Sequence, residues 1–253
     1  MTKTAPGGTQ AVLRAIGLLR SFSPHEPRRR IADLSRACGL KKTTTLRLLA
    51  ALESEGLVAR SADGSYGLGP GIIALGSQAL LTSDLRSVAR PFLEEIAFET
   101  RESSTLEVPV GGEMLILDGV SGRHVISASL DVGTRWPFHV TSTGKCILAF
   151  QGEAHRERFL SEPLKPFTKN TLTDRKALEA ELEGVRSRGY AAAFEELEEG
   201  YAAVAAPFRD GAGNVEGAIS IGAPVGRVRR EDLARLGARL AEVAEALTRA
   251  RQA

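Results

Sequence analysis

The chain has 253 residues, of which 43% are hydrophobic and 25% are charged, and its formal net charge at pH 7 is +2. This length allows one large or two ordinary domains, and the composition is that of a soluble globular protein. No apolar run approaches the roughly 20 residues that span a bilayer, and the segment MTKTAPGGTQ lacks the apolar core of a secretory signal. We therefore expect no membrane partner. Two cysteines far apart, Cys38 and Cys146, fit a reducing cytoplasm.

The small net charge hides an asymmetry along the chain. Residues 1–70 hold 11 basic and 5 acidic side chains, a net +6, whereas the remaining 22 basic and 26 acidic side chains give −4. A basic segment joined to a larger acidic one indicates that only the first part binds a polyanion. The alternative is a chance excess caused by the cluster Arg28–Arg30, and charge by itself does not separate the two.

Three short helices are predicted within the first 55 residues. The first is AVLRAIGLLRSF, which the prolines of SPHEP end. The second is RIADLSRAC, followed by Gly39, a residue suited to a left-handed C-cap. The third covers about residues 42–55. We expect stripes at helical spacing to face the core: Val12, Leu13, Ile16 and Leu19 in the first helix, Ile31, Leu34 and Cys38 in the second, and Leu46, Leu48, Leu49, Ala50, Leu52 and Glu53 in the third.

A hairpin signal follows the third helix. The stretch LVARSADGSYGLG contains two short extended segments, 57–60 and 65–68, around Asp63-Gly64, a pair favoured in tight turns that need positive φ. Two short helices joined through a glycine turn form a helix-turn-helix. The hairpin after them predicts the winged variant of that motif.

The third helix opens with the residues KKTTTLR. In a helix-turn-helix the N-terminus of the second helix enters the major groove, where lysines neutralise phosphates, threonine hydroxyls bond phosphates or base edges, and an arginine can bind a guanine edge bidentately. The alternative is an ordinary solvated helix start with a threonine as N-cap. We interpret this turn and the wing as the DNA-binding surface, with Lys41, Lys42, Thr43, Thr44 and Arg47 in the helix and Arg60 and Ser61 in the wing.

The next segment, GPGIIALGSQALLTS, is too apolar for a free linker. We expect a connecting helix that packs on a second copy of the chain and holds two winged domains at a fixed distance. Packing on its own domain is the alternative. The resulting prediction is a DNA-binding domain over residues 1–69, a linker helix over 70–83 and a second domain over 84–253.

The second half alternates helix and strand. A helix is expected from 84 to about 100, kinked or restarted at Pro91. Three strands follow, STLEVPV, EMLILDGV and HVISASL, then a long loop, DVGTRWPFHVTST, and the helix GKCILAF. Helices near 153–160 and 174–188 and a hairpin through GAGN precede a closing helix over 230–250. This order predicts the α+β class, an antiparallel sheet with helices on one or both faces. The closing helix has an apolar stripe: Leu233, Leu236, Leu240, Val243, Ala244 and Leu247.

The segment HVTSTGKC indicates a small-molecule site. A loop of hydroxyl residues, Ser142 and Thr143, enters a helix at Gly144, and the free N–H groups and positive dipole end of that helix would hold a carboxylate. Small side chains on one sheet face leave either a concavity or a surface on which a helix packs closely. Such residues are Ala218, Ser220, Gly222 and the run 202–206.

Several of these stretches together resemble an IclR-type transcriptional regulator. They are AVLRAIGLLRSF, LSRACGLKKTTTLRLLAALESEGLV, YGLGPGIIALG, TSTGKCILAF, RSRGYA and EELEEGYAAVAAPFRDGAGNVEGAISIGAP, and the resemblance covers about residues 10–250. It implies a winged helix-turn-helix, a linker helix and a GAF-like effector-binding domain. It also implies a homodimer or homotetramer that binds a pseudo-palindromic operator in double-stranded DNA and represses or activates operons, often for catabolism of small organic or aromatic acids.

The resemblance further implies where a small carboxylate-bearing effector would bind. Trp136 and Phe138 either line the apolar end of that site or belong to the core, and Glu195 borders its mouth. The implied contacts are Ser142, Thr143, Ala203, Ser220 and Gly222. The chain departs from the family pattern, in ways that bear on the effector more than on the fold, at Lys41, Cys146, Phe194, Ala203 and Gly222.

Enzymatic chemistry is a weaker interpretation. Ser142 to Lys145 have the S-x-x-K form of penicillin-recognising enzymes, but the companion motifs K-T-G and S-D-N are absent. The cysteines and histidines show no metal-ligand spacing, so we expect no metal, no cofactor and no enzyme. The acidic run, Glu195, Glu196, Glu198 and Glu199, is interpreted as a solvated turn. The competing interpretations are an enzyme that transforms a small molecule with Ser142 and Lys145, and an architectural DNA-binding protein without a ligand.

Overall fold

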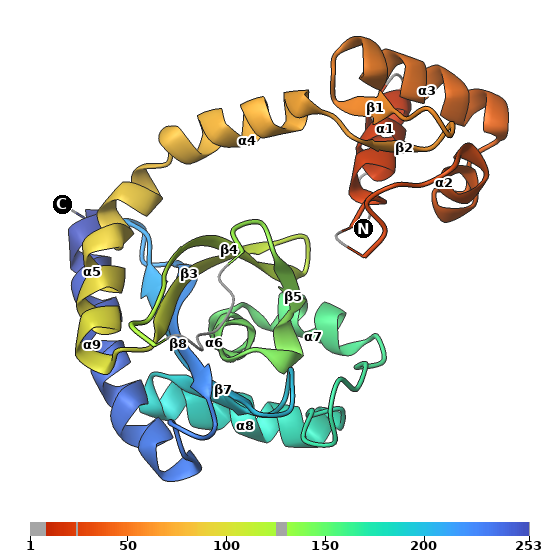
Figure 1. Cartoon of the computed structure of the whole chain (residues 1–253). Helices are drawn as coiled ribbons and strands as arrows, with labels where there is room; N and C mark the ends of the chain where they lie inside the picture. The colour runs from red at the N-terminus through yellow and green to blue at the C-terminus, as the bar shows by residue number, and fades with distance from the viewer. Residues whose placement is uncertain (1–8, 24, 125–130, 253) are drawn as a thin grey trace. The chain divides into compact units, whose positions relative to one another are not determined.

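The computed structural model describes residues 9–23, 25–124 and 131–252. They belong to two compact units, Met1–Ser83 and Asp84–Ala253 (Figure 1). The first unit is formed by helices and a hairpin, and the second is an antiparallel sheet with helices on both faces. The predicted α+β class is therefore confirmed.

The first unit contains the predicted winged helix-turn-helix. α2 and α3 are joined through Gly39, which has φ +62° and occupies the left-handed position that the sequence predicted. β1 and β2 pair antiparallel, and Gly64 between them has φ +80°. The elements of this unit are α1 Gln10–Arg20, α2 Ile31–Ala37, α3 Lys42–Ser54, β1 Val58–Arg60, β2 Tyr66–Leu68 and α4 Pro70–Leu81.

The buried face of α1 differs from the predicted one. Leu18 and Phe22 are buried in the core shared with α2 and α3, whereas Val12, Leu13 and Ile16 are exposed. Leu19, which was also predicted to face inward, is half-buried and packs against that core, so helical spacing alone selected the stripe only in part. Packing against the neighbouring helices decides which stripe is buried.

The predicted stripe of α3 is also partly wrong. Leu49 is buried as predicted, but Leu46 is exposed and Thr45 takes an inward position. The Thr45 hydroxyl donates to the Lys41 carbonyl at 3.2 Å and accepts from the Ser35 hydroxyl at 3.1 Å, so this polar group is buried without losing its hydrogen bonds. The other predicted inward residues that are exposed are Ala50 and Glu53.

α4 follows the wing and buries none of its residues. Pro70 begins the helix, where its missing N–H has no intrahelical partner to lose. The apolar side chains along it are exposed, Ile73 at 72%, Leu75 at 57% and Leu81 at 84%. Within the described part of the chain, the apolar side chains of α4 are therefore not buried against the helix's own unit.

The second unit is built on a six-stranded antiparallel sheet in the order β5-β4-β3-β8-β7-β6. α5 and α9 pack on one face, and α6 and α8 belong to the core on the other (Figure 1). The predicted stripe of α9 is buried over its whole length, from Leu233 to Leu247. The elements are α5 Asp84–Thr100, β3 Ser103–Val110, β4 Glu113–Val120, β5 Arg135–Pro137, α6 Ser142–Phe150, α7 Glu153–Leu160, α8 Arg175–Arg188, β6 Ala191–Phe194, β7 Tyr201–Arg209, β8 Val215–Pro224 and α9 Leu233–Gln252.

The segment predicted as a long loop contains regular structure. β5 pairs with β4, with Trp136 opposite Met114, and a 3-10 turn, Phe138–Val140, follows it. α6 then begins at Ser142, slightly before its predicted start. The predicted strand HVISASL covers 124–130, of which 125–130 lie outside the described residues.

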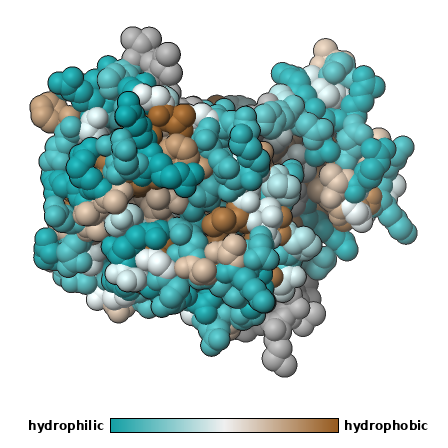
Figure 2. Space-filling view, turned by 90° about the horizontal axis from the view of Figure 1, so that it is seen from below, coloured by the Kyte–Doolittle hydropathy of each residue, from teal (hydrophilic) through white to brown (hydrophobic). Residues whose placement is uncertain are grey.

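The molecular surface is mostly polar. Hydrophilic residues predominate on the face shown in Figure 2, where hydrophobic residues form small separate areas. Most of the large hydrophobic side chains that are exposed belong to α1 and α4. Within the described ranges, no helix is both long enough and apolar enough to cross a bilayer.

Candidate functional site

The first turn of α3 presents cationic and hydroxyl side chains to solvent. Lys41, Lys42, Thr43 and Arg47 are exposed, and Thr44 is half-buried. Lys41 occupies the N-cap position, and no side chain caps the helix, so the alternative of a threonine N-cap is absent. The N–H groups of this turn and the positive end of the helix dipole are therefore available to an anion.

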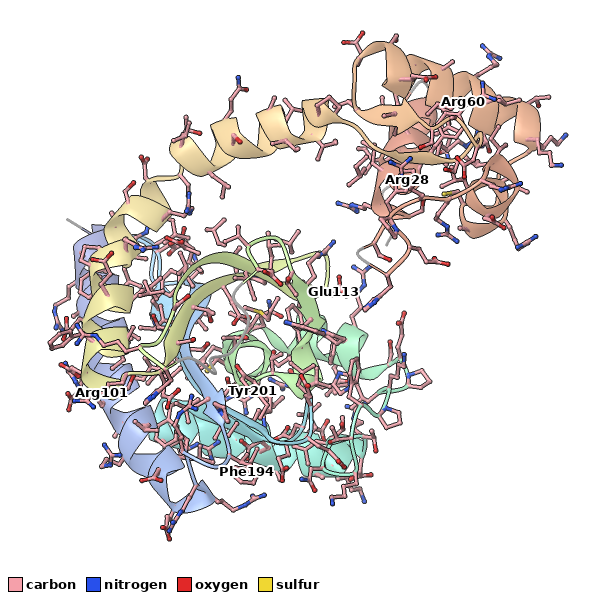
Figure 3. All side chains as sticks on the ribbon, viewed as in Figure 1. Arg28, Arg60, Arg101, Glu113, Phe194 and Tyr201 are labelled. Atoms are coloured by element: carbon pink, nitrogen blue, oxygen red, sulfur yellow. The ribbon has the colours of Figure 1, made fainter. Side chains whose placement is uncertain are left out.

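The predicted wing residues lie beside further basic side chains. Arg60 is exposed on β1 with its guanidinium 5.8 Å from the Tyr66 ring centroid, and Ser61 follows it at the start of the turn. Arg28 is exposed on the same unit (Figure 3). The Ser65 hydroxyl and N–H lower the pKa of the Asp63 carboxyl, and the charges of Arg30 and Arg28 make smaller contributions of the same sign.

The cluster Arg28–Arg30 divides between structure and surface. Arg29 is half-buried and donates from its guanidinium to the Ser21 carbonyl at 2.9 Å, while its backbone forms a bridge with Tyr66. Arg28 and Arg30 are exposed. Charge alone treats the three arginines alike, and only the fold separates the arginine that holds the hairpin from the two that face solvent.

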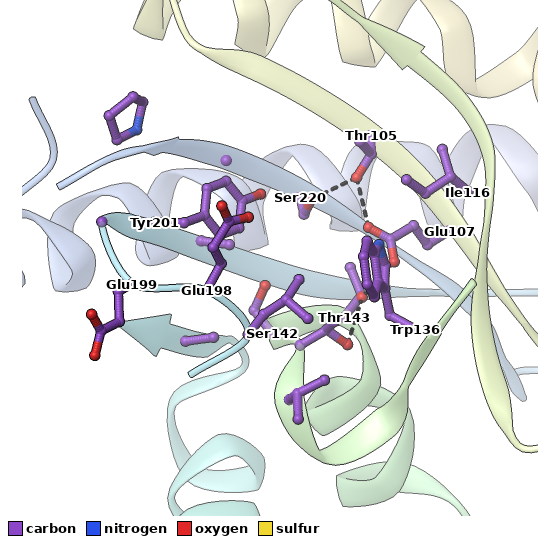
Figure 4. A pocket seen from close by; sticks show the side chains of 18 residues that line it. Thr105, Glu107, Ile116, Trp136, Ser142, Thr143, Glu198, Glu199, Tyr201 and Ser220 are labelled. Atoms are coloured by element: carbon purple, nitrogen blue, oxygen red, sulfur yellow. Dashed lines mark hydrogen bonds between the residues drawn. The ribbon is translucent and has the colours of Figure 1, made fainter. Parts of the chain in front are cut away.

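The second unit contains a cavity of about 370 Å³ between the sheet and the N-terminus of α6 (Figure 4). Six of the eight residues that the sequence predicted to contact an effector line it, namely Trp136, Ser142, Thr143, Ala203, Ser220 and Gly222. The fold thus brings together residues from β5, α6, β7 and β8 that are up to 86 positions apart.

Two predicted residues, Gly144 and Glu195, are not in the cavity wall. The Gly144 N–H donates to the Thr141 hydroxyl at 3.0 Å, and a Cβ at Gly144 would collide with the backbone of Phe138. Glu195 has φ +56°, and its carboxylate accepts from the Gly200 N–H at 2.8 Å, which holds the turn before β7. Both residues shape the fold around the cavity.

Phe138 and Trp136, which the sequence left undecided, have different positions. Phe138 is buried in the core beneath α6, with its ring centroid 5.5 Å from that of Phe159. Trp136 is half-buried and lines the cavity. The end of β5 separates them, because Trp136 lies within the strand whereas Phe138 begins the 3-10 turn Phe138–Val140, where the alternation of strand side chains no longer holds.

The small side chains of β7 and β8 serve both purposes that the sequence left open, a concavity and close packing of a helix. Toward one end, Ala205 and Ala218 belong to the core that α6 covers, and the Cys146 thiol donates to the Ala205 carbonyl at 3.2 Å. Toward the other end, Ala203, Ser220 and others line the cavity. Close helix packing and a concavity therefore occupy successive parts of the same sheet face.

Glu107 is a cavity residue that sequence reasoning did not single out. Its carboxyl is buried, with the residue 6% exposed, and accepts from the Thr105 hydroxyl at 2.8 Å and the Thr143 hydroxyl at 2.7 Å. Burial raises the pKa of the Glu107 carboxyl, and the two hydroxyl donors oppose that rise. A glutamate in an alternating strand gave no sequence signal, because its inward direction depends on strand pairing.

Tyr201 is a second cavity residue without a sequence signal. It is half-buried at the start of β7, and its ring fills the space that a side chain at Gly222 would need. Burial of the phenol group raises its pKa, so the hydroxyl stays protonated as a hydrogen-bond donor. Gly222 therefore leaves the room that the Tyr201 ring needs in the cavity wall.

The acidic run is not uniformly the solvated turn that the sequence predicted. Lys145 is 1% exposed, and its ammonium donates to the Glu196 carboxylate at 2.8 and 2.9 Å and to the Ala192 carbonyl at 2.5 Å. Burial raises the pKa of Glu196, and the charge of Lys145 opposes that rise. Since Lys145 is bonded to Glu196, the lysine of the S-x-x-K motif is not placed to activate Ser142.

Comparison with known proteins gives matches along almost the whole chain. The family model of the IclR helix-turn-helix domain matches residues 11–62, and that of the bacterial transcriptional regulator IclR C-terminal domain matches residues 77–249. The HTH-type transcriptional regulator Rv1719 of Mycobacterium tuberculosis is 35% identical over 243 residues, which cover 96% of this chain and 93% of that protein.

Solved structures resemble the chain across both units. An IclR transcriptional regulator from Silicibacter sp. TM1040 has a TM-score of 0.86 and 27% identity, over 96% of this chain and 97% of that one. An IclR homolog from Microbacterium hydrocarbonoxydans, complexed with 4-hydroxybenzoate, has a TM-score of 0.75 and 30% identity, over 95% and 99%. The proteins that this chain resembles are regulators of transcription rather than enzymes.

Proposed function

The chain belongs to the IclR family of bacterial transcriptional regulators, and from that premise we propose that α3 and the wing bind operator DNA under the control of a small molecule in the cavity. In this proposal residues 1–69 bind DNA, 70–83 link the units, and 84–253 bind the effector. The observation that carries it is the uncapped first turn of α3, with its lysines and Arg47 exposed.

Operator recognition divides between backbone and base contacts. Lys41 and Lys42 neutralise phosphates, and the hydroxyls of Thr43 and Thr44 bond phosphates or base edges. Arg47, one helical turn beyond Thr43, reaches a guanine edge. The wing adds contacts from Arg60 and Ser61 to the backbone or the minor groove. Arg28 and Arg30, exposed near the wing, extend the cationic surface.

The exposed apolar stripe of α4 supports a homodimer or homotetramer. Ile73, Leu75 and Leu81 bury little against their own chain, and such side chains favour association because burial of each contributes about 1.5–3 kcal/mol. Two copies joined there would present two winged units to a pseudo-palindromic operator.

The proposed effector is a small organic acid, aromatic or aliphatic, bound in the cavity. Three features support it: the first-turn N–H groups of α6 beside Ser142 and Thr143, the indole of Trp136, and the 4-hydroxybenzoate in the Microbacterium homolog. Effector binding alters operator affinity only if the protein can hold its winged units in two different arrangements. The acid must then bind these two arrangements with different affinity.

A footprint titration on the DNA upstream of the gene, with and without a panel of aromatic and aliphatic acids, tests the function. We expect protection of a pseudo-palindromic site and a change in operator affinity with at least one acid. Ser220→Phe fills the cavity and should abolish that change while leaving operator binding intact. Protection that no acid alters, together with no thermal shift, would instead indicate an architectural DNA-binding protein.

A further inference from the structure

The cavity has an unusual charge for a site that holds an acid. Its lining contains three carboxyl groups, those of Glu107, Glu198 and Glu199, and no lysine, arginine or histidine among the described lining residues. Glu198 and Glu199 are exposed at the mouth, where water screens them, but Glu107 lies buried inside. An acid bound here is held by neutral donors, beside a carboxyl group of the protein.

The hydroxyls around Glu107 are directed toward it. Thr143 donates to one carboxyl oxygen and Thr105 to the other. The Thr105 and Ser220 hydroxyl oxygens are 2.6 Å apart, and because the Thr105 proton is used on Glu107, Ser220 must donate to Thr105 (Figure 4). The hydroxyl and carboxyl groups at this end of the cavity therefore offer a ligand acceptor lone pairs, those of Ser220 and of Glu107 itself, beside the indole of Trp136, whose N–H is a donor.

The other end of the cavity offers donors. In Figure 4 Tyr201 lies on the opposite side of the cavity from Glu107 and Trp136, with Ser142 between them. The Tyr201 hydroxyl and the Ser142 hydroxyl both line this part of the cavity. These hydroxyls, with the N–H groups of Ser142 and Thr143 in the first turn of α6, can hold a carboxylate without a cation.

We propose that the effector is a hydroxylated acid, whose carboxylate binds at the Ser142 and Tyr201 end and whose hydroxyl donates to Glu107. Glu107 is then the residue that determines specificity. This inference rests on the proposed function, since it names the chemical group that distinguishes one acid from another. A hydroxyl gives Glu107 a third hydrogen bond, whereas an acid without a donor leaves that carboxyl group desolvated and uncompensated.

Isothermal titration of the full-length protein with matched acids tests this assignment. The aromatic series is 4-hydroxybenzoate, benzoate and 4-fluorobenzoate, in which fluorine has nearly the size of the hydroxyl but cannot donate. The aliphatic pair is 4-hydroxybutyrate and butyrate, because the hydroxyl must lie at the far end of the acid from the carboxylate. In at least one series the hydroxylated acid should bind about ten- to a hundredfold more tightly than its partner without the donor.

Glu107→Gln removes the charge at nearly constant shape. We expect it to reduce the preference for the hydroxylated acid to within about threefold and to tighten binding of the acid without the hydroxyl, because like-charge repulsion is removed. Glu198→Gln is the matched control, since it removes an exposed carboxylate of the same cavity and should leave the preference unchanged. Because the wild-type comparison needs no variant, the inference remains testable if Glu107→Gln folds poorly.

The outcomes separate the inference from the proposed function. Equal binding of hydroxylated and non-hydroxylated acids overturns the inference and leaves the acid effector standing, because Glu107 then makes no distinction between them. A preference that Glu107→Gln retains overturns the role of this residue. Failure of every acid to bind, at concentrations where the operator is protected, overturns the acid effector and the inference together.

Discussion

Arg47 is exposed one turn into α3, on the face that the winged unit turns away from its core. Leu49 and Thr45 anchor the opposite side of the helix in that core, so Arg47 is carried on a rigid support. The backbone of Arg47 is therefore already ordered, and binding a base fixes only the rotamers of its side chain.

Arg47→Ala should weaken operator binding by about 1–3 kcal/mol if the guanidinium binds a guanine edge, and it should relax specificity at one base pair of each half-site. Footprint titration of wild type and variant on operators that differ at that base pair measures both effects. Arg235→Ala, an exposed arginine of the second unit, is the control. Equal affinity of Arg47→Ala and wild type would remove Arg47 from recognition.

Glu107 should affect the pH dependence of stability as well as the specificity for the effector. Burial raises its pKa above the ordinary value of 4.5, so between that pH and the raised pKa the native state retains a proton that the unfolded state has released. Stability of the second unit therefore falls as pH rises through this window, by about 1.4 kcal/mol for each pH unit inside it. Glu196, whose pKa is also raised, adds a fall of the same sign.

Urea unfolding followed by tryptophan fluorescence measures this pH dependence, because Trp136 is the single tryptophan of the chain and lies in the second unit. Glu107→Gln should flatten the dependence relative to wild type, and Glu198→Gln should keep it. An identical slope in Glu107→Gln and wild type would show that the Glu107 carboxyl is ionised in both the native and the unfolded state.

At the scale of elements, the helices that were predicted well and those that were predicted poorly differ in how completely neighbouring elements cover their apolar residues. α9 has one apolar stripe with charged residues around it, and that stripe is buried as predicted. In α1 and α3 some apolar residues stay exposed, Val12, Leu13 and Ile16 in α1 and Leu46 in α3, so the periodic pattern included residues that the core does not bury. Packing against a partner helix decided which residues are buried in both cases.

α4 is the element whose exposed surface has the clearest consequence. Ile73→Ser combined with Leu81→Ser should raise the dissociation constant of the proposed homo-oligomer by at least about a hundredfold, because two large apolar side chains would be lost from the proposed interface. Sedimentation velocity over a range of protein concentrations measures the change. Gln78→Ser, on the same helix, should leave the association unchanged. Unaltered sedimentation of the double variant would assign the association to another surface.

At the scale of the whole molecule, the charge is divided between two compact units. The basic excess lies within residues 1–70, and the acidic excess lies in the remainder, which contains the cavity. The second unit would repel DNA on average, so binding to duplex should depend on the winged unit and on salt.

The logarithm of operator affinity should fall with the logarithm of salt concentration at a slope of about −4 or steeper, as expected when two winged units neutralise at least two phosphates each. Lys42→Ala should reduce the slope by about 1 for each phosphate that is no longer neutralised, and it should weaken binding to specific and non-specific duplexes by similar factors. Fluorescence anisotropy between 50 and 300 mM salt, on the order of the usual working range, measures both slopes. A slope near zero would contradict a phosphate-binding role for the winged unit.

The sequence by itself determined the order of elements, the winged helix-turn-helix and the glycine positions that it requires, because these depend on local backbone preferences and on short-range periodicity. It also identified five residues of one cavity through their resemblance to a known pattern, and it left Trp136, a sixth, undecided between cavity and core. Tertiary structure decided which faces of α1 and α3 are buried and where Glu107 points. Its partner Thr143 is 36 residues away, and Ser220 is 115 residues from its other partner, Thr105, so only sheet pairing and helix packing bring such distant residues to one cavity.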